Sequence, residues 1–566
     1  MSKREKMSPI DTAWLRMDRP SNLMMIVGVT TYETPVSIDQ LRQTIHDRVI
    51  TRYDRFRKRV HHDSLGAWWE DDPEFDLDNH IVRRAWPGSA GKAELQALAS
   101  EMATEPLNPL RPMWRFDLIE NYQGGSALLS RIHHCIADGI ALVGVMLSMT
   151  DLSANPPPAE QDVPAKPRKT RRVPQDPIHA VLDPVVHATQ SAFGMTGKLW
   201  HSSAELVSDP DKMAEIGKHG AGFAAELGKL LVMPADSPTR FKGKTGTVKQ
   251  VAWCDPIPLD EVKAFGKVLD CSINDVLLSA VAGALRTYLV NQGDDVAGVE
   301  IRAMVPVNMR AAGDLTLGNR FGMVTLALPV YEANPVARLF EVRRRMQEMK
   351  GSYQPPLTMV LLGVSGLAPK FIQEKFLDML ANKASAVMTN VPGPRQPLYQ
   401  CGAKVDQIMF WVPQSGDIGM GVSILSYNGM VQFGLITDRH FVASPEEITS
   451  LFVAELDRMM MTLMIHEDWN QPLDPDEIEH SIEVELGIAP PEPKVRSRRA
   501  PASRAPSAPI RKVAESKAVR RASETSSARK APSRRAVGAR VAAKRPAASG
   551  AKTPGAKRTP KRTRNA

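Results

Sequence analysis

The chain has 566 residues, a length that predicts two globular domains with additional segments rather than one ordinary domain. Hydrophobic residues make up 43% of it, which excludes a mostly disordered protein. It has only four cysteines, no secretory signal at its start and no apolar run of about 18 residues. We therefore expect a cytoplasmic protein without a transmembrane helix or a disulfide framework. The formal net charge of +9 is unevenly distributed and belongs to the end of the chain.

Residues 1–152 are predicted to form an α/β domain. Apolar runs and strict alternation indicate strands, whereas apolar residues at helical spacing behind a capping side chain indicate helices. A glycine-containing turn at 123–125 separates two of the strands, which we expect to pair. The strands are expected at 22–32, 114–120 and 126–133, and the helices at 37–50, 92–104 and 140–149.

A Pro-rich linker and a helical connector are predicted at residues 153–246. Helical patterns occupy residues 177–233 of this part. One of them contains an apolar stripe at helical spacing, formed by Phe223, Leu227, Leu230 and Leu231. Such a stripe is typical of a helix face that packs on a core, and contact with a lipid surface is the alternative.

Residues 247–480 are predicted to form a second α/β domain. Ser272 is expected to cap its longest helix, because serine is a preferred residue at that position. We expect strands at 250–254, 300–307, 322–328, 406–411, 420–425 and 430–436, and helices at 259–268, 273–289, 336–350 and 445–464.

The last part of the chain, residues 490–566, is predicted to be a disordered tail. From Lys494 onward it has 23 Lys and Arg residues, 2 acidic residues and no aromatic residue. The part before Lys494 keeps 49 basic and 61 acidic residues, so the body of the chain is acidic. The tail cannot bury enough apolar surface to offset its chain entropy. Its charge is suited to DNA phosphates or to an anionic lipid surface, and a purely solubilising role is the alternative.

The run Arg131-Ile-His-His-Cys-Ile-Ala-Asp-Gly139 is the strongest chemical signal in the sequence. Two histidines end an apolar strand, and an aspartate and a glycine follow after three residues. Neutral imidazole, with an ordinary pKa of about 6.5, is well matched to accepting a proton near neutral pH. A metal site is an alternative, because His134 and Asp138 would share one helical face, but no cluster of further ligands accompanies them. The pair His61-His62 lacks the spaced Asp-Gly and is interpreted as structural.

This run matches the HHxxxDG motif of acyl-CoA-dependent acyltransferases at every fixed position. Further segments, in the same order and at compatible spacing, resemble motifs of the bacterial wax ester synthase/acyl-CoA:diacylglycerol acyltransferase family. They are Met7-Ser-Pro-Ile-Asp-Thr-Ala-Trp14, Pro106-Leu-Asn-Pro-Leu-Arg-Pro-Met-Trp114, Asn274-Asp275, Pro306-Val-Asn-Met-Arg310, Leu317-Gly-Asn319 and Asn390-Val-Pro-Gly-Pro394. Asn108 departs from the aspartate that the family usually has. The resemblance covers roughly residues 7–470 and leaves out the basic tail.

The resemblance implies a fold like that of chloramphenicol acetyltransferase, with two α/β lobes and a substrate channel between them. Acyl-CoA and a hydroxyl acceptor would enter from opposite faces and meet at His134, the general base. The implied reaction transfers a long-chain acyl group to diacylglycerol, to a long-chain fatty alcohol, or to both, without a covalent acyl-enzyme. It implies acyl-CoA as a cosubstrate and neither a metal nor a bound prosthetic group.

The resemblance also implies roles for the neighbours of His134. His133 would support its geometry, and Asp138 would order the following turn through an arginine such as Arg310. Gly139 would give that turn its backbone freedom. The amide of Asn274 would donate a hydrogen bond to the oxyanion of the tetrahedral intermediate.

Structural roles are the alternative for Asn274, Arg310 and the segment 390–394. Asparagine favours helix starts, an arginine can tie two strands together, and glycine with proline shapes turns. Cys135 as a nucleophile is a further alternative, but strand or turn geometry would direct its thiol away from the base.

Two other functions compete with the leading hypothesis. A condensation domain of peptide synthesis shares HHxxxDG but uses carrier-protein thioesters, and the chain has no adjoining carrier or adenylation module. A non-catalytic protein that tethers lipid inclusions to DNA is the second. The lipid substrates imply peripheral association with the inner membrane face or with lipid inclusions.

Overall fold

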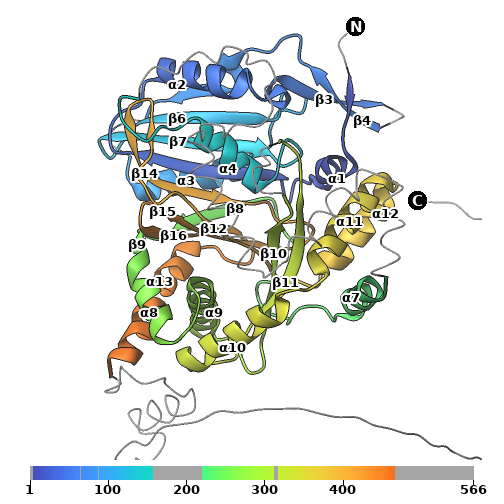
Figure 1. Ribbon diagram of the computed structural model, residues 1–566, viewed down its shortest axis with the longest axis vertical. Helices are drawn as coiled ribbons and strands as arrows, with labels where there is room; N and C mark the ends of the chain where they lie inside the picture. Colours follow the sequence, from blue (N-terminus) through green and yellow to red (C-terminus); the bar gives the residue numbers. More distant parts are fainter. Residues whose placement is uncertain are drawn as a thin grey trace, which may run out of the picture. The chain divides into compact units, whose positions relative to one another are not determined.

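Two mixed β-sheets surrounded by helices form the centre of the structure (Figure 1). This computed structural model describes residues 4–465 except 64–65, 87, 89, 157–219 and 311–315. The α/β class predicted from the sequence is confirmed. The predictions for the linker, for most of the helical connector and for the basic tail lie outside the described residues.

The first sheet contains the strand that ends in the double histidine. Strand β7 (Gly125–His133) is buried along its whole length and is antiparallel to both of its neighbours. In the turn before it, Gln123 and Gly124 have φ of 48° and 85°, so the left-handed backbone that glycine favours makes the connection short. In spatial order the strands are β13 (Tyr399–Gln400), β14 (Ala403–Trp411), β2 (Met25–Tyr32), β7, β6 (Trp114–Tyr122) and β5 (Ile81–Arg84).

The second sheet brings together the ends of three parallel strands, two of which carry motifs singled out in the sequence. Strands β10, β12 and β15 are parallel neighbours, so their carboxyl ends meet at one edge, where α/β sheets commonly bind ligands. In spatial order the strands are β11 (Phe321–Leu328), β10 (Ile301–Asn308), β12 (Ala386–Pro392), β15 (Met420–Tyr427), β16 (Met430–Asp438) and β8 (Lys249–Trp253), and the short β9 (Ile257–Pro258) also pairs with β16.

Strand β14 comes from the second half of the sequence but completes the first sheet. It pairs antiparallel with β2, between Val405↔Tyr32 and Trp411↔Val27. The sequence predicts a strand at 406–411, and that strand is confirmed. Its position in the first sheet could not be predicted from its alternation, because a period of two reports burial of one face and not the identity of the neighbour. The exchange joins the two halves of the chain at the sheets themselves.

The helices predicted within the described residues are confirmed, and α1, α11 and α12 are additional. The helices are α1 (Pro9–Met17), α2 (Ile38–Ile45) with a π-helical turn (His46–Ile50), α3 (Lys92–Thr104), α4 (Gly139–Ser148), α7 (Gly220–Val232), α8 (Leu259–Val268), α9 (Ile273–Asn291), α10 (Pro335–Met349), α11 (Gln354–Leu367), α12 (Lys370–Ala381) and α13 (Pro445–Ile465). A small third sheet has the order β1 (Glu5–Lys6), β4 (Gly66–Asp71), β3 (Lys58–Asp63).

Helix α9 is a core helix, although its length and apolar composition would also suit a membrane span. Its most apolar window is 72% buried inside the protein, and α10 and α13 pack against it. The predicted cap is confirmed, because the Ser272 hydroxyl accepts from the backbone N–H of Asp275. Asp275 in turn accepts from the backbone N–H of Ser272, so both free donors at this helix start are satisfied.

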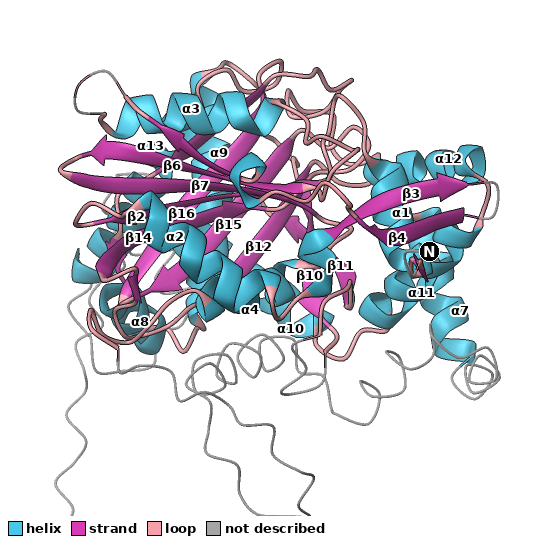
Figure 2. Cartoon of the chain, turned by 90° about the horizontal axis from the view of Figure 1, so that it is seen from above, coloured by secondary structure: helices cyan, strands magenta, loops and turns pink. Residues whose placement is uncertain are grey.

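Helix α1 is held beside the two sheets by close packing on α11 (Figure 2). A Cβ added at Gly366 would lie 1.8 Å from the carbonyl oxygen of Pro9, so only glycine allows this approach of the two backbones. The Arg16 guanidinium also donates to the carbonyl oxygens of Gly366 and Ala368, at 3.1 and 2.9 Å. This packing fixes the position of Trp14, which α1 directs toward the site.

Candidate active site

His134, the predicted base, lies directly after β7 and is 3% exposed. Its backbone N–H donates to the carbonyl oxygen of Met24 at 2.7 Å, so the residue is held against the neighbouring strand. The imidazole stacks on Trp14 with ring centroids 4.0 Å apart and the planes 20° from parallel. Phe321 lies on another side, with its centroid 5.6 Å away. The aromatic enclosure leaves the ring little freedom to rotate.

Burial changes the chemistry of this imidazole. Removal from water disfavours the imidazolium and lowers the pKa of His134 to about 4, against the opposing influence of the Asp138 carboxylate. The ring is therefore neutral throughout the physiological pH range, which is the state that a proton acceptor needs.

Asp138 organises the turn after the histidines. Its carboxylate accepts from the backbone N–H of Ala141 at 2.9 Å and so caps α4. It also accepts from the Arg310 guanidinium, at 2.8 Å in the shorter contact, and from the backbone N–H of Arg320 at 2.8 Å. The predicted pairing of Asp138 with Arg310 is confirmed, and it connects the end of β7 to the end of β10.

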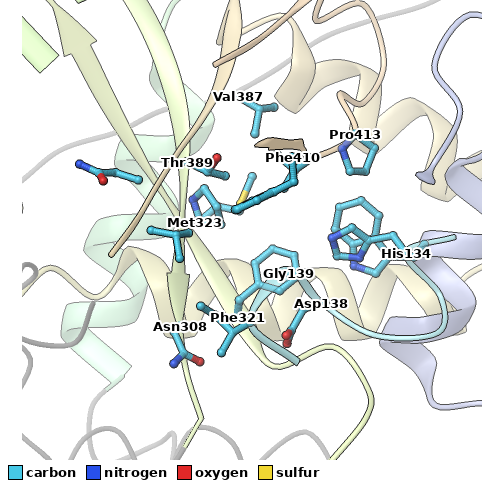
Figure 3. Close-up of a pocket in the computed structure, with 16 residues that line it drawn as sticks. His134, Asp138, Gly139, Asn308, Phe321, Met323, Val387, Thr389, Phe410 and Pro413 are labelled. Atoms are coloured by element: carbon cyan, nitrogen blue, oxygen red, sulfur yellow. The ribbon is translucent and has the colours of Figure 1, made fainter. Parts of the chain in front are cut away.

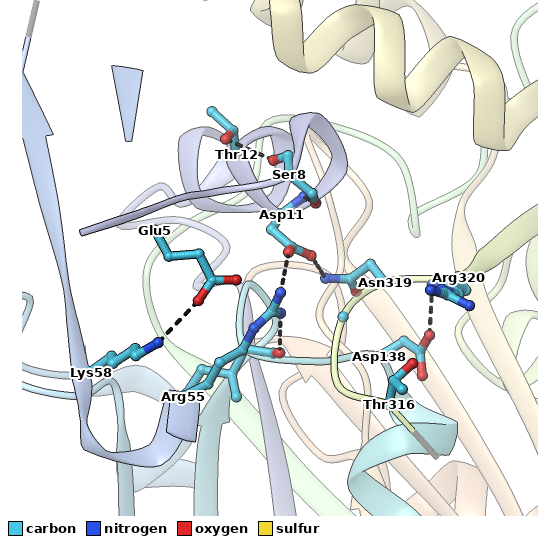
Figure 4. Close-up of polar contacts among 12 residues, drawn as sticks. Glu5, Ser8, Asp11, Thr12, Arg55, Lys58, Asp138, Thr316, Asn319 and Arg320 are labelled. Atoms are coloured by element: carbon cyan, nitrogen blue, oxygen red, sulfur yellow. Dashed lines mark hydrogen bonds and ion pairs between the residues drawn. The ribbon is translucent and has the colours of Figure 1, made fainter. Parts of the chain in front are cut away.

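A second buried network supports the backbone of the HHxxxDG run (Figure 4). The sequence alone assigned no role to its individual residues. Asn319 donates from one amide nitrogen to the Asp11 carboxylate at 2.8 Å and to the His134 carbonyl oxygen at 2.9 Å. Arg55 pairs with Asp11 at 3.1 Å and donates to the Ile136 carbonyl oxygen at 2.8 Å. Asp11 and Asn319 lie in the motifs at 7–14 and 317–319, so the sequence indicated that these two residues could matter. No motif includes Arg55, so the sequence did not indicate its contribution.

His133 faces away from the neighbouring base, as alternation along a strand requires. Its Nδ1 accepts from the backbone N–H of Cys135 at 3.1 Å, and its Nε2 lies 3.8 Å from the Asp18 carboxylate. It does not line the cavity that contains His134. This geometry agrees with a supporting role for His133, which remains a prediction.

Gly139 does not have the backbone conformation that was expected. Its φ does not lie in the left-handed region, and it forms the regular first turn of α4. The expected need for backbone freedom is therefore wrong. A Cβ at this position would meet no atom within 4 Å, because the residue borders open cavities. The absent side chain leaves space for a ligand.

Three adjoining cavities meet around the end of β12. The His134 cavity (Figure 3), about 80 Å³, is lined by His134, Trp14 and Asp138. The α9 cavity, about 250 Å³, borders the start of α9 and shares Pro306 and Asn390 with the first. The α4 cavity, about 90 Å³, runs between α4 and the first sheet and shares Gly139, Val391 and Phe410 with the His134 cavity.

Asn274 lines the α9 cavity and not the His134 cavity. Its side-chain oxygen accepts from the Asn390 amide at 2.8 Å, which leaves its own NH₂ group as a possible donor. Asn390 borders both cavities and so links Asn274 to the site. The predicted oxyanion contact of Asn274 remains a prediction.

Cys135 is buried, and burial raises the pKa of its thiol well above the ordinary value. A thiol held in its neutral form is a poor nucleophile, which argues against the cysteine alternative. Among the described residues, no group of three or more His, Cys, Asp and Glu side chains is placed to hold a metal ion.

We expect the exchange of Trp14 for alanine to raise the pKa of His134 toward 6.5, because water would reach the imidazole and stabilise its charged form. The pKa can be followed by NMR titration of the His134 ring. Trp86→Ala, a change at a partly buried tryptophan outside the three cavities, is the matched control and should leave that pKa near 4. A folded Trp14→Ala protein with an unchanged His134 pKa would contradict the stacking argument.

Comparisons with known proteins agree with this geometry. The model of the wax ester synthase/diacylglycerol acyltransferase catalytic domain matches residues 7–277, and that of the WS/DGAT C-terminal domain matches residues 317–460. The Mycobacterium tuberculosis protein named "probable diacylglycerol O-acyltransferase tgs1" is 28% identical over 409 residues, which are 71% of this chain and 83% of that protein. O-acyltransferase WSD of Acinetobacter baylyi is 25% identical over 449 residues, 76% of this chain and 92% of that protein.

Solved structures show the same fold. The wax ester synthase/diacylglycerol acyltransferase of Marinobacter aquaeolei VT8 superposes with a TM-score of 0.57 at 20% identity and covers 81% of this chain and all of that one. The first condensation domain of the calcium-dependent antibiotic synthetase gives 0.51 at 14% identity, over 84% of this chain and 98% of that one. The fold is therefore shared with condensation domains, whereas the two family models together span most of the chain. The protein belongs to the wax ester synthase/diacylglycerol acyltransferase family.

Proposed function

We propose that this O-acyltransferase transfers a long-chain acyl group from acyl-CoA to the hydroxyl of diacylglycerol, of a long-chain alcohol, or of both. The products are triacylglycerol and wax ester. The family membership and the activities named for the relatives support this reaction. The observation that carries it is the neutral, buried imidazole of His134, which lies in a cavity that adjoins two others.

In the proposed mechanism His134 acts as the general base. The imidazole removes the proton of the acceptor hydroxyl while the alcohol oxygen attacks the thioester carbonyl carbon. The tetrahedral intermediate then collapses, the C–S bond breaks, and the imidazolium returns the proton to the CoA thiolate. Asp138 and Asn319 are positioning residues, because they hold the backbone and the turn around His134. No covalent acyl-enzyme forms.

We expect His134→Ala to lower acceptor-dependent release of CoA thiol from palmitoyl-CoA by at least about a hundredfold, because a positioned base typically contributes that much. Dioleoylglycerol and hexadecanol are offered as acceptors in parallel, and their rates in the wild type rank the two activities. His61→Ala, on the partly exposed strand β3, is the matched control and should retain full activity.

Equal rates in the wild type and in His134→Ala would contradict the general-base role. A wild type that releases thiol from carrier-protein thioesters but not from acyl-CoA would favour the condensation-domain alternative.

The α4 cavity is the proposed site for a fatty chain. Among the described residues, its lining contains no charged side chain, and it shares Gly139 with the His134 cavity. An uncharged cavity favours burial of methylene groups, each worth about 0.8 kcal/mol. The free space at Gly139 therefore determines how much of a chain can pass.

We expect Gly139→Leu to reduce turnover of palmitoyl-CoA about tenfold or more relative to butyryl-CoA, because the new side chain fills the passage and costs the buried methylene groups of the longer chain. Gly228→Leu is the matched control, since that glycine of α7 also faces open space but lies outside the three cavities. Equal losses for both thioesters would place the chain elsewhere.

We also propose that the enzyme works in the cytoplasm at a lipid surface, either the inner membrane face or a lipid inclusion. Helix α11 has no charged residue in 14 positions, although part of it is exposed. The turn from α11 to α12 exposes four large apolar side chains, here called the apolar corner: Val364 (50% exposed), Leu367 (73%), Phe371 (63%) and Ile372 (47%). Such a patch marks an interaction site.

A lipid surface suits the apolar corner because its flanks are cationic and the substrates are lipids. Lys370 is 66% exposed beside Phe371, with its Nζ 3.9 Å from the Glu374 carboxylate, and Arg16 donates to the carbonyl oxygens that end α11. Anionic headgroups attract such charges while the apolar side chains enter the interface. The basic tail from residue 490 is a proposed second contact, to anionic lipid or to DNA.

We expect the double substitution Leu367→Glu/Phe371→Glu to weaken binding to phosphatidylcholine/phosphatidylglycerol vesicles at least about tenfold in a flotation assay, because charged side chains cannot enter the apolar interface. Turnover of water-soluble substrates should persist. Leu110→Glu, at an isolated residue that is 75% exposed, is the control. Truncation after Pro493 reports separately on the tail. Unchanged vesicle binding in the double variant would exclude the corner as the docking surface.

A further inference from the structure

The α9 cavity differs from its two neighbours in charge. Lys263 of α8 and Arg395, directly after the Asn390–Pro394 segment, line it, and they are its charged lining residues. The lining of the α4 cavity, as far as the structure describes it, contains no charged side chain, and in the His134 cavity Asp138 is already paired with Arg310. The α9 cavity is also the largest of the three, at about 250 Å³. It therefore suits a ligand with an anionic end.

Both cations are accessible from solvent. The Lys263 side chain is 39% exposed, and Arg395 is exposed. Asp260 is the carboxylate near both, because it accepts from Lys263 at 2.7 Å and the two positive charges lower its pKa. The Asp260 carboxylate is itself 91% exposed, so solvent weakens its hold on the lysine. An incoming phosphate can share or replace this contact.

The cavity adjoins the reaction site. Pro306 and Asn390 line both the α9 cavity and the His134 cavity. A slender group that enters between Lys263 and Arg395 is therefore directed toward the cavity of the imidazole. Neither diacylglycerol nor a fatty alcohol carries a charge that these two cations could recognise, whereas CoA has a 3′-phosphate and a pyrophosphate.

We propose that the α9 cavity is the CoA site of this enzyme, with Lys263 and Arg395 contacting the phosphates at its mouth and the pantetheine arm extending past Asn390 to His134. The inference rests on the proposed function for its substrate. It assigns each ligand to one cavity: CoA to the α9 cavity and the fatty chain to the α4 cavity. Asp260 competes with the phosphates for Lys263.

The test compares the double variant Lys263→Glu/Arg395→Glu with the wild type in two measurements. We expect the Kd of free CoA, measured by calorimetry, and the KM of octanoyl-CoA each to rise at least about tenfold, because two attractive contacts become repulsive. Turnover of octanoyl-N-acetylcysteamine, a thioester without phosphates, should stay unchanged.

Two further variants extend the test: one should strengthen CoA binding, and the other is a control that should not change it. Asp260→Asn removes the competing charge and should lower the Kd of free CoA about two- to fivefold. The control Arg83→Glu/Lys229→Glu reverses two exposed charges outside the cavity, and Lys229 pairs with Glu226 at the same i,i+3 spacing as Lys263 with Asp260. It should leave CoA binding unchanged.

An unchanged Kd of free CoA in the Lys263→Glu/Arg395→Glu protein would overturn the assignment. So would an equal loss of turnover with the N-acetylcysteamine thioester, since that ligand has no phosphate to lose. A wild type that binds CoA through these residues but transfers no acyl group would instead refute the proposed function and leave the CoA site standing.

Discussion

The buried ion pair of Asp138 and Arg310 is the interaction on which the site depends. The two side chains are 4% and 0% exposed, so each neutralises a charge that would otherwise be buried alone. Removal of one partner from such a pair typically costs about 3–5 kcal/mol. Its value here is positional, because Asp138 follows β7 of the first sheet and Arg310 follows β10 of the second. The pair thereby fixes the turn after His134 relative to the strand ends that line the His134 cavity.

The same turn bears on the proposed role of His134 as a base. Burial alone keeps the imidazole neutral but would also oppose its protonation during the reaction. The Asp138 carboxylate raises the pKa of His134 and so counteracts part of this opposition. The aspartate does not contact the imidazole in the described structure; its hydrogen bonds go to Ala141, Arg310 and Arg320. In the proposed mechanism its charge would favour the imidazolium through space, while its hydrogen bonds hold the turn.

Much of the fold was predictable because local patterns determined it. The capped start of α9, helix α3 and strand β7 all lie where alternation, helical spacing and capping place them. Helix α11 was missed because its first turn contains Pro355-Pro356 and it is apolar on most sides, so it has no amphipathic period to detect. The exchange of β14 into the first sheet depends on long-range strand pairing, which the alternation of apolar and polar residues does not predict.

The site shows the same limit. The run 131–139 indicated a base, and the arginine partner of Asp138 could be anticipated from a motif. Arg55 could not, because a single arginine among many charged residues gives no spacing signal. The backbone freedom expected of Gly139 is wrong, because its φ lies outside the left-handed region, and the open space beside the residue gives no signal in the sequence.

The Asn390–Pro394 segment shows how a turn motif can have a functional consequence. Its residues border all three cavities, and Gly393 packs so closely on β15 that a Cβ there would lie 2.3 Å from the Ser426 carbonyl oxygen. The segment therefore borders both the α9 cavity, whose lining includes Lys263 and Arg395, and the α4 cavity. In the proposed arrangement it would separate the CoA arm from the fatty chain, and its prolines, whose rings fix φ, would limit its movement. A turn motif that is recognisable in the sequence would in this way also shape two ligand sites, because only glycine allows the close approach to β15.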